Sequence, residues 1–328
     1  MQQPAEGDAR SSSVAGAGMA SIVVPTFNGA RFLGATLDSL KAQTYRDFEV
    51  IVVDDGSSDE SVHVARTHPL APSIVQQQNH GVAVARNRGL AAARGEWIAF
   101  LDQDDLWHRD RLATLMRLAG ETGASAVATT ESRFAREEDR TRLVEIGDGR
   151  DSWPTLWIAD GDEVELVKAP IADASGEVAE ITLDRLLEGA AMLTTTVMYR
   201  RDLAISAGGC APHARALDDH VLNVNVARIA GPIPRIDSRE LLYRVHPAST
   251  STVSPMVGPF LSTQAAIRLG GVFSRDVHGG PNVDHLLFGL AKSDLPASDQ
   301  FALLMLATTP RTRPRWVMRW LSRRWGIR

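Results

Sequence analysis

Residues 48–59 read FEVIVVDDGSSD, and the expected fold follows from this stretch. An almost unbroken apolar run ends abruptly at two aspartates, and Asp59 or Ser58 can cap a helix that starts just beyond them. Strands that read as continuous apolar runs are typical of sheets buried on both faces. The stretch therefore predicts a buried strand followed by a helix.

The same alternation of strand and helix continues on both sides of this stretch. The expected elements are a strand in SIVVPTFN (21–28), a helix in GARFLGATLDSLKAQT (29–44), a weaker strand in SIVQQQ (73–78), a helix in GVAVARNRGLAAARG (81–95) closed by Gly95, a strand in EWIAFL (96–101), a helix from about 109 to 120 and a strand in SAVATT (125–130). Such alternation predicts an α/β fold with a doubly wound, mainly parallel sheet.

Composition sets limits on function. The 328 residues are 44% hydrophobic and 23% charged, as in globular proteins, and a net charge of −5 argues against binding nucleic acid. A lone cysteine, Cys210, excludes an internal disulfide and is expected to pack as a small apolar residue. No apolar run reaches the ~18 residues of a membrane span, and residues 1–19 lack the pattern of a secretory signal. They are predicted to be a disordered leader, with Met19 as an alternative start.

Polar clusters follow three of the predicted strands, at residues 25–28, 54–57 and 102–105. The carboxyl ends of parallel strands meet at one edge of a sheet, which is where ligands bind in such folds. Each cluster alone is equally well explained as a turn. Five aspartates at one edge would repel one another strongly, however, and a divalent cation relieves that repulsion. Carboxylate oxygens suit Mg²⁺ or Mn²⁺, which commonly bridge phosphates.

Two other phosphate-binding folds are excluded by the same region. A dinucleotide-binding fold needs G-x-G-x-x-G after the first strand, whereas PTFNGARFLG contains only Gly29 and Gly34. A phosphate-binding P-loop is absent too.

Several motifs together resemble the family 2 glycosyltransferases of the GT-A fold. The resemblance is dense over 21–120, where it rests on SIVVPTFN, VDDGSSD and ARNRGLAAARGEWIAFLDQDD, and patchy over 190–251, where it rests on LDDHVLNVNVARIAG and LLYRVHPASTST. Residues 131–190 and those after 252 carry no such resemblance. The resemblance implies one GT-A domain at 20–252, with a nucleotide-sugar-binding half (20–130) and an acceptor and catalytic half (131–252). A helical C-terminal region is expected at 253–328.

The resemblance assigns roles to residues on the donor side. It implies that the nucleotide base is held by Pro25, Thr26, Asn28, Asp54 and Asp55, that Asp102 faces the ribose, and that Asp104 coordinates the metal. Arg244 and His246 lie in the family's closing motif, where His246 either completes the metal shell or is a plain strand-end histidine. Asp105 either supports the metal ligands or caps the next helix. Arg86 either reaches a phosphate or, by preference, is an exposed helix arginine.

The acceptor side is expected around the acidic pair Asp218-Asp219, which opens a predicted helix. The family's base, which removes the proton of the acceptor hydroxyl, corresponds to Asp219. Helix capping is the alternative role for both aspartates. His220 stands where the family usually has an aromatic residue, so it either packs there or titrates near neutrality. Trp153 and Trp157 either stack on a sugar acceptor or belong to the core.

The implied activity is metal-dependent, inverting transfer of a sugar from a nucleoside-diphosphate sugar, with UDP favoured, to a hydroxyl of a glycan or lipid-linked acceptor in cell-surface polysaccharide synthesis. A catalytically silent relative that binds nucleotide sugars is the alternative.

Residues 310–328, PRTRPRWVMRWLSRRWGIR, have seven arginines and three tryptophans, arranged mostly on opposite sides of a predicted helix. This pattern favours docking on an anionic membrane surface over packing on the acidic enzyme. The expected location is cytoplasmic, peripheral on the inner face of the plasma membrane.

Overall fold

The computed structural model describes residues 18–136, 157–158, 164–166, 176–188, 192–212 and 218–246, together with Val317, Met318 and Leu321. Its strands are β1 (Ala20–Thr26), β2 (Phe48–Asp54), β3 (Ser73–Gln76), β4 (Trp97–Phe100), β5 (Leu106–Trp107), β6 (Ala126–Ala128), β7 (Glu131–Arg136), β8 (Trp157–Ile158), β9 (Val164–Leu166), β10 (Val178–Ile181), β11 (Val197–Arg200), β12 (Ile233–Ile236) and β13 (Leu241–Arg244). Its helices are α1 (Ala30–Lys41), α2 (Ser61–Thr67), α3 (Val82–Ala92), α4 (Arg111–Thr122), α6 (Leu183–Glu188), α7 (Arg201–Ser206), α8 (Asp218–Ala230) and the 3₁₀ turn η1 (Thr194–Thr196).

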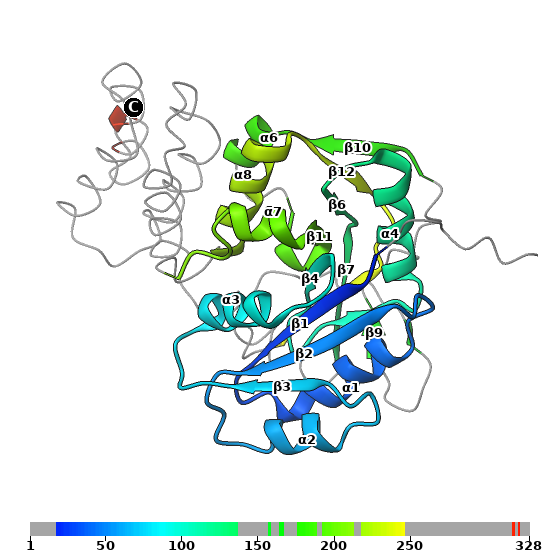
Figure 1. The fold of residues 1–328 in the computed structure, drawn as a ribbon, viewed down its shortest axis with the longest axis vertical. Helices are drawn as coiled ribbons and strands as arrows, with labels where there is room; N and C mark the ends of the chain where they lie inside the picture. Colours follow the sequence, from blue (N-terminus) through cyan, green and yellow to red (C-terminus); the bar gives the residue numbers. More distant parts are fainter. Residues whose placement is uncertain are drawn as a thin grey trace, which may run out of the picture.

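An eight-stranded sheet in the order β10-β12-β6-β11-β4-β1-β2-β3 forms the centre of the molecule (Figure 1). β1 pairs in parallel with both β2 and β4, and β2 pairs in parallel with β3. β11 is inserted antiparallel between β4 and β6. The predicted doubly wound, mainly parallel sheet is confirmed.

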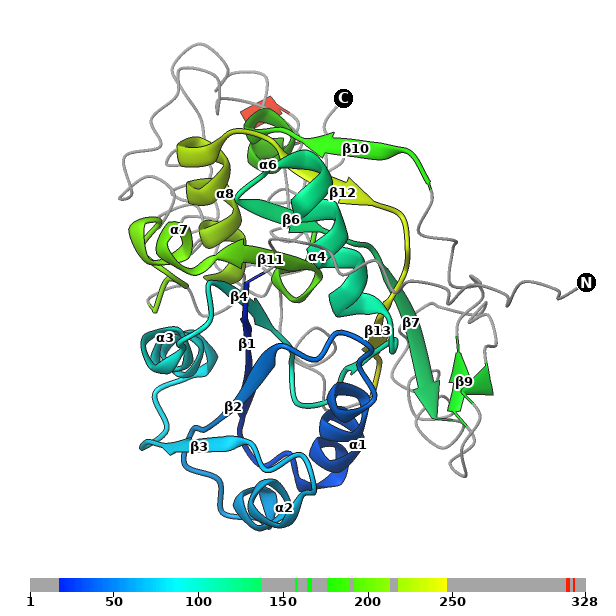
Figure 2. The same ribbon diagram turned by 45° about the vertical axis from the view of Figure 1, so that its right-hand side comes forward.

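Helices cover both faces of this sheet, because alternate residues of each strand point to opposite sides. Val23 and Phe100 pack in the core beneath α3, α7 and α8, whereas Ile22, Val24 and Leu101 pack in the core beneath α1 and α4. Figure 2 separates the two layers, with α3, α7 and α8 on the left of β1 and β4 and with α1 and α4 on their right. Burial on both faces explains why the strands lack polar alternation.

Gly95 does not close α3, contrary to the expectation. The helix ends at Ala92, and its cap is Ala93. Gly95 instead lies against the backbone of β1, where a Cβ atom would come within 2.7 Å of the Ser21 nitrogen. Its own N–H donates to the Ser21 hydroxyl at 2.9 Å. The glycine is needed for this close approach of two backbones.

A second, five-stranded sheet in the order β5-β13-β7-β9-β8 was not predicted. β5 follows the acidic loop at 102–105 and pairs antiparallel with β13, Leu242 opposite Leu106 and Leu241 opposite Trp107. β13 also pairs in parallel with β7. This pairing brings the end of β13 to the acidic loop.

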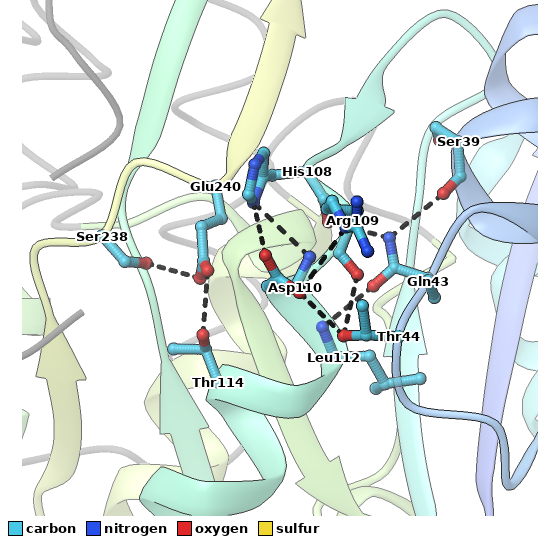
Figure 3. A network of polar contacts seen from close by, with 10 residues as sticks. All are labelled: Ser39, Gln43, Thr44, His108, Arg109, Asp110, Leu112, Thr114, Ser238 and Glu240. Carbon is cyan, nitrogen blue, oxygen red and sulfur yellow. Dashed lines mark hydrogen bonds and ion pairs between the residues drawn. The ribbon is translucent and has the colours of Figure 1, made fainter. Parts of the chain in front are cut away.

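Polar contacts fix the chain that follows the acidic loop (Figure 3). Gln43, at the end of α1, is fully buried; its Nε2 donates to the His108 carbonyl at 2.8 Å, and its Oε1 accepts from the Leu112 N–H at 3.0 Å. The carboxylate of Glu240 accepts from the hydroxyls of Thr114 and Ser238, each at 2.8 Å. The β5–α4 connection is thus held between α1 and the start of β13.

The predicted leader, Trp153 and nearly all of the expected C-terminal region lie outside the described residues, so the predicted domain limits stay predictions. Trp157 starts β8, but its side chain is not described. Within the described residues, the helices are all too short or too polar to cross a bilayer.

Candidate active site

The loops that follow β1, β2 and β4 are joined by hydrogen bonds. The Asp55 N–H donates to the Thr26 carbonyl at 2.7 Å, which ties the end of β2 to the end of β1. The Gln103 side chain binds the backbone of Phe27 twice: its Oε1 accepts from the N–H at 2.9 Å, and its Nε2 donates to the carbonyl at 3.2 Å. The three polar clusters therefore meet at one edge of the sheet, as expected.

Asn28 shapes the loop after β1. Its φ of 48° lies in the left-handed region, which asparagine tolerates better than most residues. Its N–H donates to the Ser57 hydroxyl and its Oδ1 accepts from the Ser58 N–H, both at 2.9 Å. Pro25 and Thr26 are buried at the end of the strand. Asn28 thus joins the first loop to the second.

The first amides of α1 already have protein partners. The Gly29 N–H donates to the Ser61 hydroxyl at 2.8 Å, and the Ala30 N–H donates to the Asp59 carboxylate at 3.0 Å. Free amides at a helix start commonly bind phosphate. Since Ser61 and Asp59 occupy these two amides, they are not free to bind a phosphate.

The aspartate pair after β2 is buried and bound to neighbouring loops. Asp55 accepts from the Gln77 side chain at 2.7 Å and from the N–H groups of His80 and Gly81, both at 2.8 Å. Asp54 accepts from the Ser57 N–H at 3.2 Å. A carboxylate offers about four acceptor positions. Asp55 therefore anchors the loop before α3 and keeps about one position for a ligand.

Asp102 is paired with Arg86. The guanidinium NH2 lies 2.7 Å from the Asp102 Oδ1, and the arginine side chain is only 6% exposed, compared with 32% for the aspartate. The preferred expectation of an exposed Arg86 is therefore wrong. Burial raises the pKa of Asp102, and the carboxylates of Asp104 and Asp219 add to this, while Arg86 acts against it.

Asp104 meets His246, 142 positions later in the chain. Nε2 of His246 lies 2.8 Å from Oδ2 of Asp104. The ring of His246 packs on Phe32 of α1, with centroids 4.7 Å apart, and is almost fully buried. Asp104 stays partly exposed, at 22% of its side chain. The closing motif is thus brought to the acidic loop, as the resemblance implied.

Asp105 supports this pair and does not cap a helix. Its Oδ1 accepts from the Arg244 N–H at 2.8 Å, while α4 begins only at Arg111. Arg244 Nε donates to the Asp104 carbonyl at 2.6 Å, and its guanidinium lies 4.9 Å from the centre of the Phe32 ring. Burial, with the charges of Asp104 and Asp102, raises the pKa of Asp105 well above its ordinary value.

The side chains at this edge offer a few ligands for a divalent cation. Among the residues that the structure describes, no group of three or more His, Cys, Asp or Glu side chains gathers closely enough to form a complete protein cage. Asp104 and His246 do offer one oxygen and one nitrogen side by side. Two protein ligands fit a cation that keeps water molecules and takes its remaining ligands from a diphosphate.

Asp219 lies at the start of α8, as predicted, and is half-buried. Its Oδ1 accepts from the His220 N–H at 2.8 Å, and its Oδ2 accepts from the Thr194 N–H at 3.4 Å. The charge of Asp219 helps to raise the pKa of Asp102, so the two carboxylates are electrostatic neighbours. Asp218 belongs to the same turn, but its side chain is outside the described part.

His220 is packed inside the protein. It is 4% exposed, and this burial lowers its pKa, although the charge of Asp219 and a hydrogen bond to the backbone of Leu186 oppose the shift. The packing role is therefore favoured over a titrating group at neutral pH.

Sequence reasoning missed three residues of this region. Phe27 exposes 44% of its surface beside the strand end, Gln103 bridges two loops, and Thr194 contacts Asp219. Phe27 could have been noted, because it is the aromatic residue that follows Pro-Thr in the motif. Nothing in the sequence indicates where the side chain of Gln103 or the backbone N–H of Thr194 will point.

Part of the chain matches a known family of proteins. Residues 21–175 match the family model described as Glycosyl transferase family 2. The amylovoran biosynthesis glycosyltransferase AmsB of Erwinia amylovora is 41% identical over 98 residues, which cover 28% of this chain and 33% of that protein. The chain matches only about a third of the length of its curated relatives.

Two solved structures resemble the fold. TarS of S. aureus in complex with UDP-GlcNAc has a TM-score of 0.56 at 18% identity, covering 93% of this chain and 81% of that chain. The mannosyltransferase PcManGT of Pyrobaculum calidifontis, in complex with GDP-Man and Mn²⁺, has a TM-score of 0.53 at 20% identity, covering 96% and 89%. At sequence identities of 18% and 20%, this likeness shows a shared fold and nothing further.

Proposed function

We propose, because residues 21–175 match the model of glycosyl transferase family 2, that this protein is an inverting, metal-dependent glycosyltransferase that uses a nucleoside-diphosphate sugar. The observation that carries the proposal is the meeting, at one sheet edge, of the Asp104–His246 pair, Asp102 and the half-buried Asp219. These groups come from the acidic loop, the segment just after β13 and α8, so a ligand at this edge would contact all three.

The donor is proposed to lie along the ends of β1, β2 and β4. Asp55 would use its remaining acceptor position for a base N–H, beside Asn28 and the buried strand end. Asp102 faces the ribose in this arrangement, and Arg86 holds its carboxylate in place. A UDP-sugar is favoured by the resemblance, while one structural neighbour binds UDP-GlcNAc and another GDP-Man.

Asp104 and His246 would hold the cation. When bound, a divalent cation neutralises the charge of the diphosphate and makes it a better leaving group. Imidazole nitrogen is a softer ligand than carboxylate oxygen, so the pair favours Mn²⁺ over Mg²⁺. Asp105 and Arg244 keep this pair in register through their contacts with each other and with the Asp104 carbonyl.

Asp219 is proposed as the general base. The acceptor hydroxyl oxygen forms a new bond to C1 of the donor sugar on the face opposite the diphosphate, and the C1–O bond to the diphosphate breaks. Asp219 takes the hydroxyl proton as this happens, so the products are an inverted glycoside and a nucleoside diphosphate. The half-buried carboxylate is open enough to meet an acceptor and is fixed on both oxygens by backbone N–H groups.

One experiment tests donor binding and chemistry separately. Binding of UDP, GDP and dTDP sugars is measured by calorimetry with Mn²⁺, with Mg²⁺ and with EDTA, for the wild type, Asp104→Ala, Asp219→Asn and the control Asp237→Asn. Asp237 is an acidic residue whose carboxylate pairs with Arg239. We expect Asp104→Ala to lose metal-dependent binding, and Asp219→Asn to bind donor normally.

Transfer to glycan and lipid-linked acceptors is measured for the same variants. Asp219→Asn should lower the rate by ~10²- to 10⁴-fold, as expected on loss of a general base. Near-normal turnover in Asp219→Asn would rule out this base. Tight donor binding with no transfer by the wild type, over a panel of acceptors, would favour the silent nucleotide-sugar-binding relative.

The acceptor is proposed to be a glycan or a lipid-linked sugar of a cell-surface polysaccharide. AmsB is named for amylovoran biosynthesis, and the Arg- and Trp-rich segment after residue 310 suits a membrane surface. We accordingly propose a peripheral location on the inner face of the plasma membrane.

A further inference from the structure

A buried asparagine stands inside the helix that carries Asp219. Asn223 is fully buried on α8, between apolar neighbours that include Leu222 and Val224. A buried amide is costly unless its hydrogen bonds are made. The Asn223 Oδ1 accepts from the Tyr199 hydroxyl at 2.6 Å, and its Nδ2 donates to the Thr194 hydroxyl at 3.3 Å.

The three side chains form one buried hydrogen-bonded cluster, with Asn223 in the middle. Tyr199 donates to Asn223, and Asn223 donates to Thr194. Burial raises the pKa of Tyr199 well above its ordinary value, so its hydroxyl keeps its proton and remains a donor. All three residues are inaccessible to solvent.

This hydrogen-bonded cluster is connected to Asp219 in two ways. Asn223 lies four residues after Asp219 on α8, so the two side chains start from the same face of the helix. The Thr194 N–H donates to Asp219 Oδ2 at 3.4 Å. This is a long hydrogen bond, and a small shift of the threonine would break it. The position of Thr194 therefore decides whether the contact exists.

The rest of the 3₁₀ turn is held independently of α8. The Thr195 carbonyl accepts from Arg111 NH2 at 2.8 Å, and the Thr196 carbonyl accepts from the Thr129 N–H at 3.0 Å. The turn is thus a fixed point on the central sheet. Tyr199, on β11, is part of that sheet as well. The cluster therefore connects the central sheet and its 3₁₀ turn to one turn of α8.

We propose that Tyr199, Thr194 and Asn223 are positioning residues for the base Asp219: they fix the start of α8 on the sheet and hold the Thr194 N–H against the carboxylate. This inference rests on the proposed function, because it assumes that Asp219 is the base. None of the three touches the reacting atoms in this arrangement. A displacement of about 1 Å in a reacting group can cost ~10²-fold in rate.

The test uses the full-length protein with Thr194→Val, Thr194→Ser and Tyr199→Phe. The matched control is Thr196→Val, because the Thr196 hydroxyl bonds to the Leu193 carbonyl within the same turn and not to α8. We expect Thr194→Val and Tyr199→Phe to lower kcat by ~10- to 10²-fold while the donor KM stays within about twofold of the wild type. Thr194→Ser keeps the hydroxyl and should retain most of kcat, and Thr196→Val should be nearly normal.

A second measurement does not depend on activity. The backbone N–H of residue 194, which donates to Asp219 Oδ2, is followed by NMR in the ligand-free protein through its proton chemical shift and its rate of hydrogen exchange. Loss of this contact in Thr194→Val should move the amide proton signal upfield and speed its exchange with solvent.

The outcomes separate this inference from the proposed function. Unchanged kcat and an unchanged amide signal of residue 194 in Thr194→Val would overturn the positioning role, as would an equal loss of kcat in Thr196→Val. A wild type without transferase activity would overturn the proposed function and the role of Asp219 as base, whereas the amide signal would still test the contact between Thr194 and Asp219 by itself. If Tyr199→Phe does not fold, the Thr194→Val and Thr194→Ser pair decides the question.

Discussion

Gln103 shows how a residue between two aspartates of the proposed site can serve that site through the backbone of a neighbouring loop. Its side chain makes two hydrogen bonds to Phe27 and so fastens the acidic loop to the loop after β1. Asp102 and Asp104 have partners of their own, Arg86 and His246. Gln103 is therefore the residue that connects the base-binding and phosphate-binding parts of the proposed donor site.

We expect Gln103→Ala to weaken binding of nucleoside diphosphate about tenfold and to leave kcat nearly unchanged. Each lost hydrogen bond contributes ~0.5–1.5 kcal/mol, and the loops would separate in the free protein. Calorimetry of UDP binding measures the effect, with Gln78→Ala, an exposed glutamine in a neighbouring loop, as the control. Equal affinity in Gln103→Ala and the wild type would contradict this role.

His220 makes stability depend on pH. Its pKa in the folded protein lies below the ordinary value of 6.5, because burial disfavours the charged ring. The unfolded chain therefore binds more protons than the folded one between these two pKa values, so the free energy of unfolding falls as the pH drops below 6.5. His220→Gln removes the titrating group and should make this fall shallower.

The measurement is urea unfolding of the wild type and His220→Gln at pH 7.5, 6.5, 5.5 and 5.0. His63→Gln serves as the control, since this histidine is exposed on α2. Parallel pH curves for the wild type and His220→Gln would argue against a buried, neutral imidazole.

At the scale of the elements, the close approach of the loop between α3 and β4 to β1 depends on Gly95. An added Cβ would lie 2.7 Å from the Met19 carbonyl oxygen and from the Ser21 nitrogen, so the backbone of one strand must move. We expect Gly95→Ala to lower the free energy of unfolding by about 2–4 kcal/mol.

Gly34→Ala, on α1, is the matched control, because its Cβ would meet nothing closer than 3.8 Å. That change should be neutral or stabilise by up to about 1 kcal/mol, since alanine favours helix. Thermal denaturation of both variants checks the contrast; similar melting temperatures would contradict the steric account.

The elements also divide into those that a sequence reveals and those that it does not. β1, β2 and β4 were predictable because they are apolar on both faces, and α8 because Asp218-Asp219 precedes a buried helical pattern. β5 has two residues and pairs with a strand more than 130 positions away, which leaves no local pattern to detect. The buried Arg86 was missed for a similar reason, because its partner Asp102 lies on another element.

At the scale of the whole molecule, charge is distributed unevenly along the chain. The overall net charge is −5, although residues 310–328 contain seven arginines and no acidic residue. The remainder is therefore more acidic than the whole. A basic segment on an acidic protein can bind either an anionic membrane or the protein itself, and these choices differ in what its removal does.

We expect truncation before Arg311 to leave the fold and donor binding intact and to reduce co-sedimentation with anionic vesicles. Each arginine near an anionic leaflet contributes ~1 kcal/mol, and the attraction should weaken with salt because exposed charges are screened over ~8 Å at physiological ionic strength. Transfer to a lipid-linked acceptor should slow more than transfer to a soluble one. A full-length variant with Arg319 and Arg323 changed to Gln is the matched control for loss of charge alone. Equal vesicle binding by the full-length and truncated proteins would refute membrane docking, and unfolding on truncation would favour the packed helix.

The pairing of β5 with β13 has a consequence for synthesis on the ribosome. Asp104 leaves the exit tunnel long before its partner His246, since 142 positions separate them. A nascent chain can complete β1, β2 and β4 early, yet it carries an acidic loop whose charges have no histidine beside them until β13 has emerged and paired. Such distant pairings form slowly, because a long loop must close before any contact is gained. Under the proposed function, a cation and a donor would therefore have no finished site to bind on an incomplete chain, and they would stabilise the protein only after translation has passed residue 246.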